Sequence, residues 1–189
     1  MMNEEVKAKY KKKKVPHEWR KTNRISALVT TFLGSGTLPK MPGTWGSLAA
    51  ALCAYPMAIF FGNNIPCISW FNPSFLVASV IVFFAAIPFV NKAMRDCGTE
   101  DPGWIVIDEV AGQWLALAFV PTAFIVENVW VVLVAFALFR LFDITKPLGI
   151  HRFEKFPEGW GVMADDMLGG LYAGLLLAAG YHCIPMILG

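Results

Sequence analysis

Five long apolar runs, separated by short polar segments, constrain the fold of this chain more than any other feature. The runs are Trp45–Phe61, Ser74–Val90, Trp104–Val126, Val129–Phe142 and Met167–Leu188. A helix that crosses a bilayer needs about 17–25 residues, and only the fourth run is shorter. Because 56% of the 189 residues are hydrophobic, we expect an all-α, polytopic membrane bundle of about five apolar helices. The fourth run is either a thin span or half of a re-entrant hairpin with the third.

All 16 Lys and Arg residues lie in alternate segments of the chain. They precede the first run, separate the second from the third, or lie at and after the end of the fourth. The loops near residues 62–73 and 121–128 hold none. Because basic loops stay on the cytoplasmic side, the N-terminus is expected in the cytoplasm and, with five spans, the C-terminus outside.

The charge distribution divides the chain into two parts. Residues 1–25 are expected to form a basic, partly flexible segment, and residues 26–189 one integral-membrane domain. The block Lys11–Lys14 would either attract anionic membrane lipids or remain a solvated tail. We expect no nucleic-acid partner, and the scattered cysteines form no CxxC pair that would indicate a zinc site.

Five carboxylates lie at the ends of apolar runs, all on the predicted cytoplasmic face. They are Asp108, Glu109, Asp143, Asp165 and Asp166. Acids at membrane depth are costly and rarely persist without a function. Four of them form two acid-acid-x-x-Gly motifs, at 108–112 and 165–169. In each motif the glycine lets a second helix approach the carboxylates. A single pair could be a helix cap, but two pairs together with Asp143 predict a divalent-cation site and metal-assisted chemistry on a phosphorylated lipid.

Two cations accompany Asp143, since Arg140 and Lys146 each lie three residues from it. They would either orient the helix at the membrane surface or bind phosphate, and Lys146 is the favoured phosphate contact. Pro147 is expected to stop this helix. Arg140 could instead pair with an acid.

A glycine-rich segment, Gly34–Ser47, leads directly into the first apolar run. Glycines and free N–H groups at a helix start favour phosphate binding. The alternative is an irregular lead-in with Thr44 or Ser47 as the N-cap. The candidate phosphate ligands of this segment are Ser35, Thr37, Lys40, Thr44 and Ser47.

Absent motifs narrow the chemistry. The sequence has no cysteine-phosphatase loop, no DxDx[TV] signature and no paired-histidine pattern, although His151 could assist from its loop. A metal-activated water is therefore the simplest mechanism. The alternatives are a cation-binding transporter, which should carry acids deeper in its spans, and a non-catalytic lipid-binding membrane subunit.

Four motifs together resemble the phosphatidylglycerophosphatase A family and cover roughly residues 32–175. They are PGTxGS at 42–47, IVxDExxG at 105–112, FRxFDxxKP at 139–147 and GxMxDDxxxG at 161–170. The resemblance implies a multi-pass enzyme of the bacterial inner membrane that dephosphorylates phosphatidylglycerophosphate on the cytoplasmic side. It implies that the five acids hold one or two Mg²⁺ ions and that Lys146, Arg140 and the Thr44–Ser47 loop neutralise the phosphate. Formation of a homodimer stays open.

Overall fold

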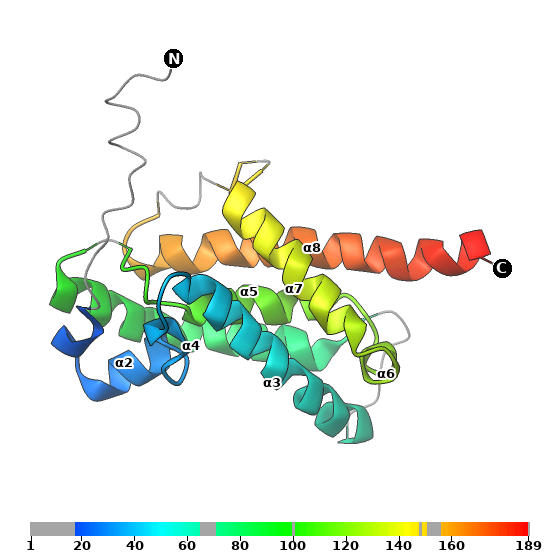
Figure 1. Cartoon of the computed structure of the whole chain (residues 1–189), viewed down its shortest axis with the longest axis horizontal. Helices are drawn as coiled ribbons and strands as arrows, with labels where there is room; N and C mark the ends of the chain where they lie inside the picture. Colours follow the sequence, from blue (N-terminus) through cyan, green and yellow to red (C-terminus); the bar gives the residue numbers. More distant parts are fainter. Residues whose placement is uncertain (1–17, 65–70, 100, 148, 151–155, 189) are drawn as a thin grey trace, which may run out of the picture.

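The computed structural model describes residues 18–64, 71–99, 101–147, 149–150 and 156–188. Within these residues the chain forms seven α-helices and two short 3-10 helices, with no β-strand (Figure 1). The helices are η1 Glu18–Lys21, α2 Arg24–Thr30, η2 Ser35–Thr37, α3 Pro42–Asn64, α4 Pro73–Cys97, α5 Ile107–Leu117, α6 Thr122–Glu127, α7 Trp130–Thr145 and α8 Gly159–Leu188. The predicted all-α class is confirmed.

Three helices are long and apolar enough to cross a membrane. The candidate spans are Pro42–Phe60, Pro73–Cys97 and Gly159–Cys183. The third predicted run is instead divided between α5 and α6, because the chain turns after Leu117 and resumes at Thr122. At 1.5 Å per residue α5 is about 16 Å long, roughly half of a hydrocarbon core of about 30 Å. A membrane protein fits this structure, while the count of about five spans and the re-entrant hairpin stay predictions.

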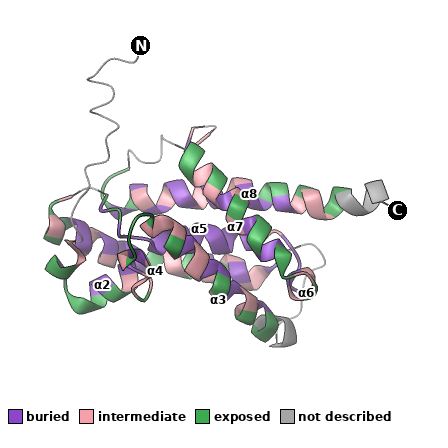
Figure 2. Cartoon of the chain, in the orientation of Figure 1, coloured by how far each residue is buried: buried purple, intermediate pink, exposed green. Residues whose placement is uncertain are grey.

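Helix α5 is the centre of the molecule. It packs against α3, α4, α7 and α8, and every one of its residues is buried. Figure 2 shows this continuous buried stretch beside the exposed outer faces of α3 and α7. Since a helix without an exposed face needs neighbours all round, the two acids in its first turn lie inside protein.

Glycines bring α8 against α5. A Cβ on Gly112 would lie 2.5 Å from the backbone oxygen of Asp166, and one on Gly170 would overlap the carbonyl of Gly112. The predicted role of glycine after an acid pair therefore fits Gly112. In the second motif the close contact is made by Gly170, because a Cβ on Gly169 would meet only ordinary contacts near 3.8 Å.

Helix ends differ from the apolar runs in two places. α8 begins at Gly159, so Asp165 and Asp166 lie in its second turn rather than at its start. The predicted run began too late because the two acids interrupt the hydropathy of the helix. α3 begins at Pro42, a favoured first residue, so neither Thr44 nor Ser47 is its N-cap. α7 ends at Thr145, just before Pro147, as expected.

Residues 18–25 pack on the bundle. Both η1 and α2 contact α4, and the Thr22 hydroxyl donates to Asp96 at 2.7 Å. Part of the predicted N-terminal segment is therefore attached to the helical domain, and α2 begins at Arg24, before the predicted boundary. The block Lys11–Lys14 lies outside the described residues, and the division at residue 25 stays a prediction.

The α5–α8 contact predicts opposite effects for two glycine substitutions. Gly170→Ala should lower the free energy of unfolding by about 1–3 kcal/mol, because the added methyl meets backbone that cannot move aside. Gly180→Ala, where a Cβ would meet nothing within 4 Å, should gain up to about 1 kcal/mol from helix propensity. Thermal loss of helical circular dichroism in detergent measures both. A Gly170→Ala protein as stable as the Gly180→Ala protein would contradict the close packing.

Candidate metal centre

Three carboxylates from two helices converge at one end of the bundle. Asp108 and Glu109 lie in the first turn of α5, and Asp166 lies in the second turn of α8. One carboxylate oxygen of each lies within 4.8 Å of the others. All three residues are at most 8% exposed. Figure 1 shows the starts of α5 and α8 at the same end of the molecule, away from the C-terminus.

Two oxygens of this triad have no hydrogen-bond partner within the described structure. They are Asp108 Oδ1 and Glu109 Oε2. A buried carboxylate oxygen without a partner costs free energy, and a buried charge costs far more. Hard oxygen ligands of this kind are what Mg²⁺ and Ca²⁺ bind. The donor set, its spacing and its unpartnered oxygens therefore fit a divalent cation.

Burial changes the acidity of the α5 pair. It raises the pKa of Glu109 to about 8, and the neighbouring Asp166 carboxylate adds to the effect. Burial likewise raises the pKa of Asp108 well above its ordinary value, with Glu109 as the next cause. Ionising these groups is therefore costly unless a cation lies beside them. The electrostatics and the unpartnered oxygens point to the same requirement for positive charge.

Arg140 of α7 lies on one side of the triad. Its Nη1 pairs with Asp143, one helical turn on, and lies 3.5 Å from Glu109 Oε1. The same guanidinium reaches the hydroxyls of Ser47 and Thr44 at 3.5 Å each. Arg140 thus connects α7, α5 and the start of α3. The structure brings Thr44, Ser47 and Asp143 to the centre through this one side chain.

Lys146 lies on another side and pairs with Asp165 of α8. It is the C-cap of α7 and adopts a left-handed conformation, with φ of 44°. Lys146 therefore lies past the end of the helix that carries Arg140 and Asp143. Lys146 and Asp165 are therefore adjacent to the triad as an ion pair, with Lys146 partly accessible from outside.

The glycine-rich lead-in contributes close packing. A Cβ on Gly43 would overlap the carboxylate of Glu109, and a Cβ on Gly46 would overlap Val106. Ser47 donates its hydroxyl to the Gly43 carbonyl at 2.8 Å. Only glycine lets the first turn of α3 lie directly against the acids. The lead-in therefore brings the α3 backbone, as well as two hydroxyls, to the centre.

The remaining predicted residues lie farther along the lead-in. Ser35 and Thr37 donate their hydroxyls to the backbone carbonyls of Thr31 and Gly34. Lys40 is exposed. Within the described structure, no hydrogen bond or ion pair joins these three residues to the acids. His151 lies outside the described residues.

Sequence reasoning missed Gln113. This residue is fully buried on α5, and neither atom of its amide has a hydrogen-bond partner within the described structure. It follows Glu109 by four residues and so lies on the same helical face. A glutamine one turn after an acid, in an otherwise apolar helix, was the available signal. Its buried amide offers both a donor and an acceptor beneath the acids.

Comparisons with known proteins place the chain in a family. The model of the family "Phosphatidylglycerophosphatase A" matches residues 28–181. A Bacteroides thetaiotaomicron protein named "Putative phosphatidylinositol-3-phosphatase" is 40% identical over 158 residues, which cover 82% of this chain and 92% of that protein. No solved structure matches the chain.

Two further relatives carry the family's own name, "Phosphatidylglycerophosphatase A". The Haemophilus influenzae protein is 37% identical over 83% of this chain and 88% of its own length. The Escherichia coli K12 protein is 34% identical over 82% of this chain and 83% of its own length. Because the matches extend over most of each chain, this protein belongs to the phosphatidylglycerophosphatase A family and is an enzyme of the phosphoric monoester hydrolase class.

Proposed function

We propose that this chain hydrolyses phosphatidylglycerophosphate to phosphatidylglycerol and phosphate, with Mg²⁺ as its cofactor. The reaction would belong to phospholipid biosynthesis at the cytoplasmic face of the bacterial inner membrane. The convergence of Asp108, Glu109 and Asp166 within 4.8 Å carries the proposal. The names of the Haemophilus and Escherichia relatives support the substrate.

The side of the membrane follows from charge. The acids lie in the first turn of α5 and the second turn of α8. Lys92, Arg95 and Lys146 lie in or beside the connections that precede those helices. Basic residues favour the cytoplasmic side. The centre would then face the compartment in which phospholipid precursors are made, while the lipid tails remain in the bilayer.

The proposed reaction needs negative charge to be neutralised at the phosphate. Water adds to the terminal phosphorus, the P–O bond to glycerol breaks, and the glycerol oxygen recovers a proton. Asp108, Glu109 and Asp166 would hold the metal, with Asp143 and Asp165 beside them. A bound Mg²⁺ supplies Lewis-acid stabilisation of phosphoryl oxygens. Lys146 would contact the phosphate. Arg140 would fix the positions of Glu109, Asp143 and the start of α3 relative to one another.

Membership of an enzyme family favours the phosphatase over a cation transporter or a non-catalytic lipid-binding subunit. The Bacteroides relative, however, carries the name of a phosphatidylinositol-3-phosphatase. A phosphoinositide monoester is therefore the second candidate substrate. Both lipids present a phosphate monoester on a polar headgroup, so the acid centre alone does not separate them. Phosphate release from the two lipids, measured side by side at matched chain length, gives the preference.

Asp166→Asn should lower phosphate release from phosphatidylglycerophosphate by at least about 100-fold, because one charged ligand of the cation is lost. Wild-type activity should vanish with EDTA and return with Mg²⁺. The matched control is Glu127→Gln, an exposed acid at the end of α6, which should retain activity. Circular dichroism reports folding in detergent. A folded Asp166→Asn protein with normal turnover would exclude this acid from the centre.

Removing each cation should have a different result. Lys146→Gln should lose kcat/KM, because Lys146 would contact the phosphate. Its melting temperature should fall less than that of Arg140→Gln, because Lys146 is partly exposed and pairs with one acid, Asp165. Arg140→Gln should lose both activity and stability, because the partly buried guanidinium pairs with two acids that would remain uncompensated. Equal melting temperatures for the two variants would show that Arg140 does not stabilise the bundle in this way.

A further inference from the structure

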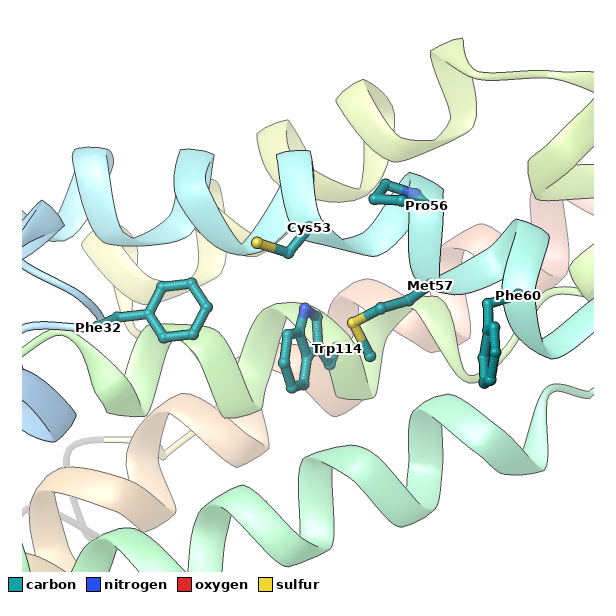
Figure 3. Close-up of a pocket in the computed structure, with 6 residues that line it drawn as sticks. All are labelled: Phe32, Cys53, Pro56, Met57, Phe60 and Trp114. Carbon is teal, nitrogen blue, oxygen red and sulfur yellow. The ribbon is translucent and has the colours of Figure 1, made fainter.

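An apolar groove of about 430 Å³ lies along α3, over Trp114 of α5 (Figure 3). Its lining residues are Phe32, Cys53, Pro56, Met57, Phe60 and Trp114. It is an open groove with an almost entirely apolar lining rather than an enclosed cavity. None of these residues belongs to the acid centre, so the groove has no role in the reaction as described so far.

Three contacts fix the groove relative to the acids. Gly43 lies against Glu109, Gly46 lies against Val106, and the Ala50 carbonyl accepts a hydrogen bond from Trp114 Nε1 at 3.1 Å. α3 and α5 therefore run side by side, starting from the acid end. Cys53 follows Gly43 by ten residues, which corresponds to about 15 Å along α3. The groove thus lies beyond the acid centre on the same pair of helices.

Strained backbone shapes the end of the groove nearer the acids. Phe32, Leu33 and Gly34 all have positive φ, at 42°, 58° and 95°. Such conformations are unfavourable for large side chains and concentrate at functional sites. Here they place the Phe32 ring edge-on against Trp114, with centroids 6.2 Å apart. Figure 3 shows Phe32 at one end of the groove and Phe60 at the other.

The surroundings of the groove identify its occupant. α3 is a candidate membrane span from Pro42 to Phe60, so the groove lies at hydrocarbon depth. Phe60 is 64% exposed, so the far end of the groove opens toward the bilayer. A ligand that reaches both the acids and the groove needs a phosphate at one end and a hydrocarbon chain about 15 Å away. Those are the properties of a phospholipid with a phosphorylated headgroup.

We propose that the groove binds one acyl chain of the substrate lipid while the terminal phosphate lies at the acid centre. The offset between them leaves room for the headgroup that connects phosphate and chain. This assignment rests on the proposed lipid phosphatase function, because the phosphate anchors the lipid at the acids. The groove would align the substrate with the centre, and so would favour long-chain lipids over short-chain ones.

A filling substitution tests the groove. Cys53→Phe should occupy it and raise the KM for dioleoyl phosphatidylglycerophosphate about tenfold, the size expected for a lost apolar contact. KM for the dihexanoyl lipid and kcat for both should change little. Leu52→Phe is the matched control, because Leu52 is the neighbouring residue, is 69% exposed and does not line the groove. Met57→Trp provides a second filling variant in case Cys53→Phe does not fold.

Each outcome has a distinct meaning. Selective loss with the long-chain lipid, absent from Leu52→Phe, supports the acyl site. Equal effects on both lipids, or the same effect from Leu52→Phe, would overturn it and assign the groove to bulk bilayer lipid. If the wild-type protein released phosphate from neither lipid, the proposed phosphatase function itself would fail. The wild-type measurements therefore separate failure of the function from failure of the groove.

Discussion

Negative charge buried at one end of an apolar bundle is the constraint on which the rest of this structure depends. Asp108, Glu109 and Asp166 lie together with little access to water, and such groups need positive charge or hydrogen bonds nearby. Arg140 pairs with Glu109 and Asp143, and Lys146 pairs with Asp165. Two oxygens of the triad nevertheless have no hydrogen-bond partner in the described structure. The protein thus supplies part of the compensation, and a divalent cation would supply the remainder.

Backbone proximity makes this concentration of acids attainable. Gly112 and Gly170 let α8 cross α5 with their backbones in contact, and Gly43 lets the first turn of α3 lie against Glu109. In a bilayer, helices gain no hydrophobic advantage from association, so close van der Waals packing of small residues carries more of the stability. The same glycines therefore hold the helices together and set the spacing of the carboxylates. Stability and site geometry are coupled at these positions.

The sequence predicted features that depend on local spacing. The all-α class and the end of α7 before Pro147 follow from hydropathy and proline chemistry. Pairing of Arg140 with an acid was only an alternative to phosphate binding, and in the structure Arg140 pairs with Asp143, three residues away. Contacts between distant segments were not accessible in this way. The pairing of Lys146 with Asp165 joins residues that are 19 positions apart in the chain. The acids of α8 lie a turn deeper than predicted because the acid pair interrupts the hydropathy of a helix that already begins at Gly159.

The pairing of α3 with α5 connects the two ends of the proposed lipid site. Gly43 lies against Glu109 at the acid end, and the Trp114 indole donates to Ala50 about two helical turns farther along α3. Sliding one helix along the other would break this hydrogen bond and drive Gly43 away from the acids. The distance between the centre and the groove is therefore fixed by packing within the bundle. A lipid held at both points would be selected by the length of its headgroup as well as by its phosphate.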